Sequence, residues 1–260
     1  MDKLIRYLSV DFEMLTKHKW DKVLIIDGDE GTSKSNLALT LVDLWQTALN
    51  GEVKPTDIDN ICLNIKQFGA SLRKLPPYNM VVYDEAGELT KMRMMSRFNN
   101  TINLAYQVIR GRSYFSILVL PSVFDLDSRF TKRRARGYIH IYKRGVYGYF
   151  NKTRLRMMMD NFNKTKSENR ARASVKPLFV EKFPEYKDTE LRKLYDKKKE
   201  KRMQEITEIL DKLDESEESG INEFSKDNAK YDGDSDFNNL SGKLRNFKRP
   251  RDRDNSFNDY

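Results

Sequence analysis

The stretch GDEGTSKS at residues 28–35 decides the fold that this sequence predicts. It fits the phosphate-binding pattern G-x-x-x-x-G-K-[ST] at every fixed position except Ser33, where the pattern has glycine. The apolar run 23–26 before it suits a central parallel strand that is buried on both faces, and residues 36–49 after it repeat apolar positions at helical spacing. The sequence therefore predicts a strand, a phosphate-binding loop and a helix in that order.

The chain up to residue 150 continues as an alternation of short apolar runs and helical patterns. The expected elements are an N-terminal helix at 3–18, strands at 60–65, 80–85 and 115–120, helices at 66–75 and 90–110, and an edge hairpin of 138–142 with 146–150. Such alternation is typical of an α/β fold with a mainly parallel sheet and helices on both faces. Together with the loop at 28–35, this order of elements resembles the RecA-like fold of P-loop NTPases, which we therefore expect.

The composition changes after residue 153. The expected regions are an N-terminal helix over 1–20, a P-loop ATPase domain over 21–153, a basic and helical extension over 154–215 and a disordered tail over 216–260. Within the extension, 154–174 is interpreted as a mobile basic segment and 191–213 as a charged surface or partner helix. The tail is rich in Ser, Asn, Asp, Gly and Lys, a composition that cannot bury a core.

The charge balance favours an anionic partner. The chain has 48 Lys and Arg against 39 Asp and Glu, a formal net charge of +9, which indicates nucleic acid without separating DNA from RNA or from an acidic membrane. The single cysteine, Cys62, can form neither an internal disulfide nor a metal site. No apolar run approaches the roughly 18 residues of a transmembrane helix, and the N-terminus is too charged for a signal peptide. We expect a cytoplasmic protein, in the host cell if it is viral.

The loop at 28–35 carries the groups that bind a nucleoside triphosphate. Backbone N–H groups at a helix N-terminus favour phosphate, Lys34 would reach the β- and γ-phosphates of ATP, and Ser35 would ligate Mg²⁺. Ser33 puts a Cβ and a hydroxyl where the pattern has the smallest residue. The residues expected to bind ATP are Gly28, Asp29, Glu30, Gly31, Thr32, Ser33, Lys34, Ser35 and Asn36.

The expected strand at 80–85 ends in two acids, Asp84 and Glu85. Taken alone, they are an ordinary strand end with solvated carboxylates. Together with the loop they fit a Walker B motif, in which Asp84 holds Mg²⁺ directly or through water and Glu85 activates the attacking water as general base. The pair favours hydrolysis over the chemistry of a small-molecule kinase.

Polar and basic residues further along the chain are further candidates. Ser122, after the strand at 115–120, is either a sensor of the γ-phosphate or the N-cap of a helix that begins near Phe124. The run 129–136 either supplies an arginine to the nucleotide of a neighbouring subunit or is a solvated or DNA-facing basic helix. The candidate arginines are Arg129, Arg133, Arg134 and Arg136, with Arg110 and Arg112 behind them.

These motifs together resemble a known family. The loop, the VVYDE run at 81–85, the LVLPS run at 118–122 and the arginine-rich segment are similar to the FtsK/HerA-like branch of additional-strand ATPases, which includes DNA-pumping motors and the zonula occludens toxin-like proteins of filamentous phages. The resemblance covers residues 20–150. The chain departs from it at Ser33 and in having Pro121 and Ser122 where many members carry Thr-Gln. The resemblance implies a homo-oligomeric ring that uses ATP and Mg²⁺ to move DNA.

Two classes of function compete, and a third is disfavoured. The leading one is an ATP-hydrolysing motor on nucleic acid, of viral or plasmid type, in DNA packaging, transfer or virion morphogenesis; the basic segment 152–176 suits sequence-independent phosphate contacts. The alternative is a nucleotide-dependent switch or assembly scaffold with little hydrolysis, whose C-terminal helix and tail bind a protein partner. A nucleotide kinase is disfavoured because such enzymes seldom end the second motif in Asp-Glu.

Overall fold

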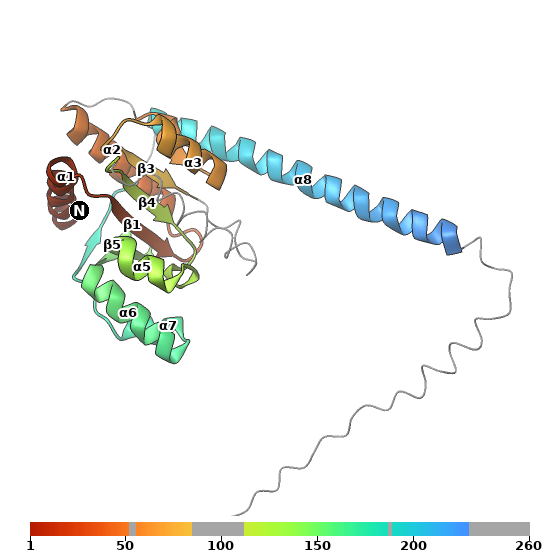
Figure 1. Cartoon of the computed structure of the whole chain (residues 1–260). Coiled ribbons are helices and arrows are strands. Elements are labelled where there is room, and N and C mark those ends of the chain that lie inside the picture. Colours follow the sequence, from red (N-terminus) through yellow and green to blue (C-terminus); the bar gives the residue numbers. More distant parts are fainter. Residues whose placement is uncertain (52–55, 85–111, 187–188, 229–260) are drawn as a thin grey trace, which may run out of the picture. The chain divides into compact units, whose positions relative to one another are not determined.

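The computed structural model describes residues 1–51, 56–84, 112–186 and 189–228, and these contain a seven-stranded sheet between helices (Figure 1). The strands are β1 (Lys22–Gly28), β2 (Ile61–Cys62), β3 (Met80–Tyr83), β4 (Phe115–Val119), β5 (Ala135–Lys143), β6 (Val146–Asn151) and β7 (Phe179–Lys182). They lie in the order β2-β3-β4-β1-β5-β6-β7. The first five in this order are parallel, whereas β6 pairs antiparallel with β5 and with β7. The predicted α/β fold with a mainly parallel sheet is therefore confirmed.

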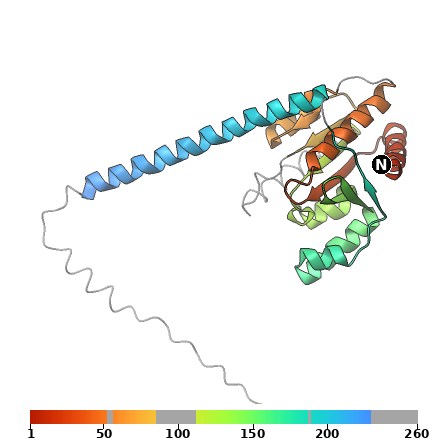
Figure 2. The same ribbon diagram turned by 180° about the vertical axis from the view of Figure 1, so that it is seen from behind.

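Helices cover both faces of the sheet (Figures 1 and 2). They are α1 (Asp2–His18), α2 (Lys34–Asn50), α3 (Ile65–Lys74), α5 (Ser128–Arg134), α6 (Lys152–Thr165), α7 (Glu168–Ala173) and α8 (Glu190–Asn228), with short 3-10 turns at Ile58–Asn60 and Val123–Asp125. Alternate side chains of β1 point into two separate cores. Val23 and Ile25 pack with α3, α5, α6 and α7, while Leu24 and Ile26 pack with α1, α2 and the first turns of α8.

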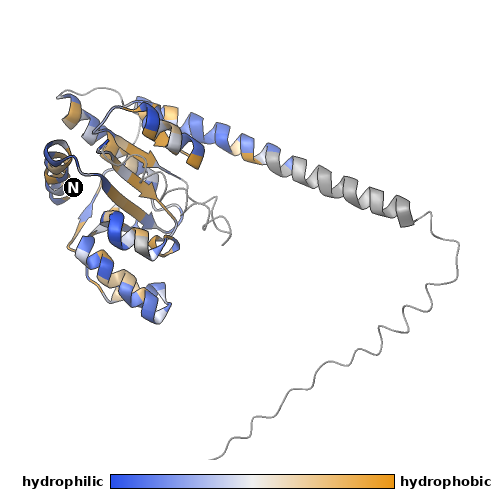
Figure 3. Ribbon diagram, in the orientation of Figure 1, coloured by the Kyte–Doolittle hydropathy of each residue, from blue (hydrophilic) through white to orange (hydrophobic). Residues whose placement is uncertain are grey.

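The central strands are mostly apolar, as Figure 3 shows for β1, β3 and β4. All seven residues of β1 are buried, which confirms the prediction of a strand covered on both faces. The surrounding helices are amphipathic, and α1 buries Leu4, Leu8 and Leu15 on one side. Burial on two faces therefore fixes β1 as the centre of the fold.

Side-chain caps set where several helices begin. The Asn64 side chain accepts a hydrogen bond from the N–H of Gln67 at 2.8 Å, and Asn151 accepts one from the N–H of Arg154 at 3.1 Å. Each bond satisfies a first-turn N–H group that the helix itself leaves without a partner. The caps place α3 and α6 directly after a strand.

Three features differ from the sequence-based expectations. The hairpin of β5 and β6 is not at the sheet edge, because β7 pairs with the outer side of β6. The segment 154–174, expected to be mobile, forms α6 and α7, and α6 buries Leu155, Met158 and Met159 on one face while its basic residues point outward. Finally, α8 continues past residue 216 to Asn228. The prediction for 154–174 was wrong because it followed the basic composition and overlooked apolar residues at helical spacing.

Two predicted segments lie outside the described residues: the helix at 90–110 and the tail over 229–260. Contacts divide the chain into a compact unit, Met1–Arg202, and a second unit, Met203–Tyr260. The first unit contains the sheet and the first turns of α8. No helix in the described part of the chain is both long and apolar enough to span a membrane.

Candidate functional site

The loop between β1 and α2 is a tight turn with three residues at positive φ, Gly28, Gly31 and Ser33. Gly28 has φ +148°, and a Cβ there would lie 2.7 Å from the carbonyl oxygen of Ile141, so no larger residue fits. Gly31 and Ser33 both have φ 73°, in the left-handed region. Glycine adopts this conformation without steric strain, whereas the Cβ of serine makes it unfavourable. The structure thus gives the reason why the pattern has glycine at the position of Ser33.

Lys34 folds back across this loop. Its ammonium group donates hydrogen bonds to the carbonyl oxygens of Gly28 at 2.6 Å and Asp29 at 2.8 Å, and the Thr32 hydroxyl donates to the same Asp29 oxygen at 2.6 Å. The side chain of Lys34 therefore places a positive charge inside the turn of the loop.

Burial lowers the pKa of Lys34, and the negative charges of Asp27 and Asp84 act in the opposite direction. These two carboxylates stand at the ends of β1 and β3, which are separated in the sheet by β4. Ile25 of β1 and Tyr83 of β3 are both in register with Leu118 of β4, so Asp27 and Asp84 both lie toward the carboxyl end of the parallel strands. The loop and Asp84 are therefore at the same end of the sheet.

The first turn of α2 is available to an anion. The helix begins at Lys34, its N-cap residue Ser33 makes no side-chain capping bond, and its first turn contains no acidic residue. A helix of this length places partial positive charge at its N-terminus. Ser35 follows in this turn and is half-buried, while the exposed side chains of Asp29 and Glu30 stand outside it.

Asp84 lies directly after β3 and is buried, with an exposed fraction of 4%. Its N–H donates to the carbonyl oxygen of Cys62 at 2.8 Å, which holds the strand end against β2. Its carboxylate accepts a hydrogen bond from the hydroxyl of Tyr195 at 2.7 Å. Its neighbour Glu85, the predicted general base, lies outside the described residues.

The first turns of α8 close this end of the site, which the sequence did not predict. Tyr195 is only 2% exposed, and its hydroxyl donates to Asp84. The Arg192 guanidinium donates to the side-chain oxygen of Asn36 on α2. The ammonium of Lys198 donates to the carbonyl oxygens of Ile58 and Ile61, the latter at 2.5 Å. The only signal in the sequence was the pair Leu191 and Tyr195, apolar at a spacing of four residues and both buried.

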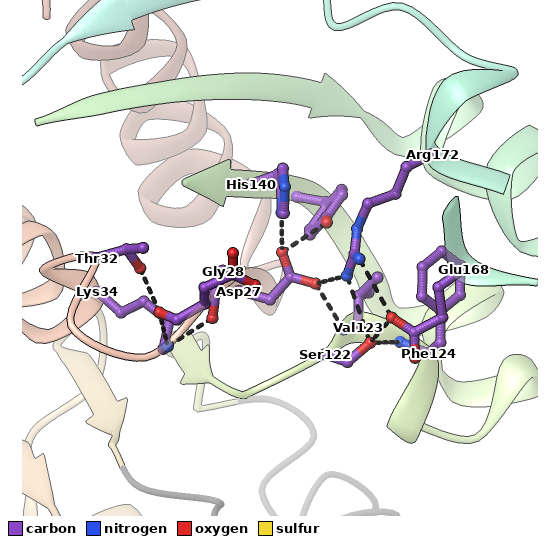
Figure 4. A network of polar contacts seen from close by, with 12 residues as sticks. Asp27, Gly28, Thr32, Lys34, Ser122, Val123, Phe124, His140, Glu168 and Arg172 are labelled. Carbon is purple, nitrogen blue, oxygen red and sulfur yellow. Dashed lines mark hydrogen bonds and ion pairs between the residues drawn. The ribbon is translucent and has the colours of Figure 1, made fainter. Parts of the chain in front are cut away.

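A second polar centre surrounds Asp27, the residue that precedes the loop (Figure 4). Its carboxylate is fully buried and accepts bonds from Tyr138 at 2.6 Å, the Val123 N–H at 2.8 Å and Arg172 at 2.8 Å. The Nδ1 atom of His140 lies 2.7 Å from the same carboxylate, which can only accept, so this nitrogen carries the proton. Asp27 thus joins β1 to β5, to the turn after β4 and to α7.

Ser122 belongs to this centre. Its hydroxyl donates to Glu168 at 2.9 Å and accepts from the N–H of Phe124 at 3.3 Å, and Arg172 approaches it at 3.4 Å. The N-cap interpretation of Ser122 is therefore confirmed, on the 3-10 turn that starts at Val123. Its role as a γ-phosphate sensor stays a prediction.

Arg133, Arg134 and Arg136 lie at the opposite end of the strands from the loop. Gly28 is in register with Ile141, whereas Val23 is in register with Ala135, five positions earlier on β1, or roughly 16 Å along the strand. Arg133 and Arg134 end α5 immediately before this start of β5, and the guanidinium of Arg136 lies 5.6 Å from the ring centroid of Trp20. Arg133, Arg134 and Arg136 therefore lie away from the loop of the same chain.

For Arg129, only its position in α5 is described, and Arg110 lies outside the described residues. Arg112 donates to the carbonyl oxygen of Arg73 at 2.7 Å and ties the start of the β4 segment to the end of α3. The action of any of these arginines on a neighbouring subunit stays a prediction. No protein-family model matches this chain, and a comparison with curated proteins finds no match either.

Proposed function

We propose that this chain binds ATP with Mg²⁺ and hydrolyses it, as a P-loop NTPase of the additional-strand class that resembles FtsK/HerA-like motors. The observation that carries the proposal is the position of Lys34. Its ammonium lies within the loop, at the same end of the parallel strands as Asp84, which follows a separate strand. The strand β4 lies between β1 and β3, the kind of insertion from which the additional-strand class takes its name.

The residues of the loop fit a triphosphate. The first-turn N–H groups of α2 and the Lys34 ammonium supply positive charge, and the crowded backbone at Gly28 excludes a side chain at that position. In ATP binding, Lys34 would leave the loop carbonyls of Gly28 and Asp29 and reach the β- and γ-phosphates. The lysine is held at the place where it is needed, so little reorganisation is required.

The protein also fits Mg²⁺ that arrives with the nucleotide. Among the described residues, no group of three or more His, Cys, Asp or Glu could hold a metal by itself. Magnesium usually binds through one or two carboxylates together with substrate phosphates. Asp84 and Ser35 are the protein ligands we propose, and the ion would neutralise charge on the phosphates. Glu85, the next residue after Asp84, would take the proton of the attacking water.

We further propose that the ATPase acts on nucleic acid, DNA in the leading interpretation, as a homo-oligomeric ring. The net charge of +9 supports an anionic partner. The arginines at 133–136 lie away from the loop of their own subunit, which leaves them placed for a neighbouring subunit or for DNA. The first of these roles needs an assembly, so the ring is part of the proposal.

One observation favours the alternative, a nucleotide-dependent switch with little hydrolysis. Ser33 holds a left-handed conformation that costs a non-glycine residue roughly 1–2 kcal/mol, and Tyr195 of α8 is bonded to the proposed magnesium ligand. A strained loop and an occupied carboxylate would both slow turnover. In this case α8 would transmit the nucleotide state to a protein partner.

The test is ATP binding and phosphate release by the full chain, with and without DNA. Lys34→Ala should abolish both binding and release, Glu85→Gln should keep binding and lose release, and Lys66→Ala, an exposed lysine on α3, should match the wild type. DNA-stimulated release that Glu85→Gln abolishes supports the motor. Tight ATP binding by a wild type without turnover selects the switch. Binding that Lys34→Ala leaves unchanged overturns both.

A further inference from the structure

A cavity of about 340 Å³ lies on the face of β5 and β6 that the end of α7 borders. Its volume falls within the range of small-molecule sites, roughly 300–1,000 Å³. It is lined by Tyr138, His140, Tyr142, Phe150, Arg172, Ala173, Val175, Lys176 and Pro177. The proposed ATP site uses none of these residues.

The floor of the cavity is aromatic because of strand geometry. Tyr138, His140 and Tyr142 occupy alternate positions of β5 and so share one face of the sheet. Phe150 stands opposite Tyr138, with ring centroids 5.2 Å apart. Gly148 stands opposite His140, and a Cβ at Gly148 would lie 2.8 Å from the ring of Tyr142. The absence of a side chain at this glycine lets the tyrosine ring lie across the neighbouring strand.

The polar groups of the cavity are all bases or phenols, with no carboxylate among the lining residues. Arg172 is fixed by ion pairs with Asp27 at 2.8 Å and Glu168 at 3.2 Å, both behind the wall, and its guanidinium stacks on Phe124 at 5.0 Å. Burial lowers the pKa of Arg172, but the charges and hydrogen bonds of Asp27 and Tyr138 together raise this pKa above its ordinary value. Arg172 therefore stays charged. Lys176 is exposed and forms no salt bridge with any described residue.

Exposed aromatic and apolar side chains surround the opening of the cavity. Tyr142 is 45% exposed, and Val180 of β7, in register with Gly148, is 53% exposed on the same face. The edge of the Tyr142 ring meets His140, with centroids 4.9 Å apart at 88°. An incoming ring therefore finds an exposed aromatic side chain at the entrance and two cationic side chains beside it.

We propose that this cavity binds one nucleotide unit, with the planar base against the exposed ring of Tyr142 and the phosphate on Lys176, beside Arg172. Bases stack on aromatic side chains with little dependence on sequence, and lysine side chains make sequence-independent contacts with phosphate. The unit comes either from a free mononucleotide or from a single strand of nucleic acid; the second source rests on the proposed function, whereas the chemistry of the cavity does not.

The experiment uses the full chain with Lys34→Ala, so that the ATP site does not contribute. The probes are a fluorescent twelve-nucleotide thymidine oligonucleotide, read by anisotropy, and unlabelled thymidine monophosphate and inorganic phosphate as competitors. Test variants are Tyr142→Ala, Lys176→Ala and Ala173→Trp, the last of which fills the cavity from an exposed position. Matched controls are Tyr7→Ala, which is 41% exposed on α1, and Lys66→Ala.

We expect Tyr142→Ala to weaken oligonucleotide binding about 5- to 100-fold, the range that loss of one stacked base gives. Ala173→Trp should abolish it, Lys176→Ala should reduce the salt dependence by about one phosphate contact, and the controls should bind like the parent. Competition by the monophosphate, but not by phosphate alone, identifies the free nucleotide as a source; binding of the oligonucleotide alone identifies the single strand.

The proposal is overturned if neither probe binds, or if Tyr142→Ala and Ala173→Trp leave the affinity within twofold of the two controls. Circular dichroism checks that each variant is folded, which the exposed positions of Tyr142, Ala173 and Lys176 favour. A wild type that hydrolyses no ATP removes the proposed motor but leaves these binding measurements intact. Failure of the cavity and failure of the ATPase are thus distinguished.

Discussion

Substitution of Asp27 by asparagine should be among the most destabilising single-atom changes in this fold. The carboxylate is fully buried and receives four groups, two on each oxygen: Tyr138 and His140 on Oδ1, and Val123 and Arg172 on Oδ2. An amide replaces one acceptor oxygen by an NH₂ group, which cannot accept. In either orientation two of the four bonds are lost, and Arg172 loses its nearest counter-charge.

The size of the effect follows from the environment of Arg172. Removal of one partner of a buried ion pair costs about 3–5 kcal/mol. Arg172 keeps a second carboxylate, Glu168 at 3.2 Å, and its side chain is 23% exposed, so we expect the lower end of this range, about 3 kcal/mol. Urea unfolding followed by circular dichroism measures the difference.

The matched control is Asp160→Asn, which breaks the surface ion pair with Lys132 while 55% of the aspartate side chain is exposed. Such pairs contribute at most about 1 kcal/mol. A loss below about 1 kcal/mol for Asp27→Asn, equal to that of the control, would refute the view that Asp27 ties the loop strand to its neighbours.

Three further outcomes are expected. Ser33→Gly should raise the free energy of unfolding by up to about 1 kcal/mol in urea titrations, because relief of roughly 1–2 kcal/mol of left-handed strain exceeds the added backbone entropy. Tyr195→Phe should lower it by about 1–2 kcal/mol, because the carboxylate of Asp84 loses a buried hydrogen bond. Burial raises the pKa of the Cys62 thiol from 9.0 to about 11, so iodoacetamide at pH 8 should modify the folded protein far more slowly than the protein in urea. The same shift should reduce stability above pH 9, where the unfolded thiol ionises first.

The sequence predicted the centre of the fold because its signals there are local. The run 23–26, the loop and the periodic helix after it agree with one another, and each needs only neighbouring residues to be recognised. The departure at Ser33 was visible as well, although only the backbone angle shows what it costs. Motifs of adjacent residues are therefore the part of this site that sequence reasoning finds.

The remaining contacts join residues far apart in the chain. Arg172 and Asp27 are 145 positions apart, and Tyr195 and Asp84 are 111 apart, so no periodicity reports either pair. Arg172 lies in a segment interpreted as mobile because its charge is conspicuous, whereas the apolar stripe of α6 that anchors the segment is not. The prediction that 154–174 is mobile was therefore wrong because it did not take into account contacts with residues far away in the sequence.

Asp27 lies between the two proposed sites and contacts residues of both. Asp27 directly precedes Gly28, whose carbonyl oxygen holds Lys34, and on its other side it holds Tyr138, His140 and Arg172 of the cavity (Figure 4). Because the carboxylate is buried and each oxygen has two partners, it cannot shift toward one site without loosening the other. Asp27→Asn should therefore weaken both ATP and oligonucleotide binding. Tyr142 forms no hydrogen bond with Asp27, so Tyr142→Ala should weaken oligonucleotide binding and leave ATP binding unchanged. Comparison of the two variants shows whether the two sites are connected through Asp27 or are only adjacent.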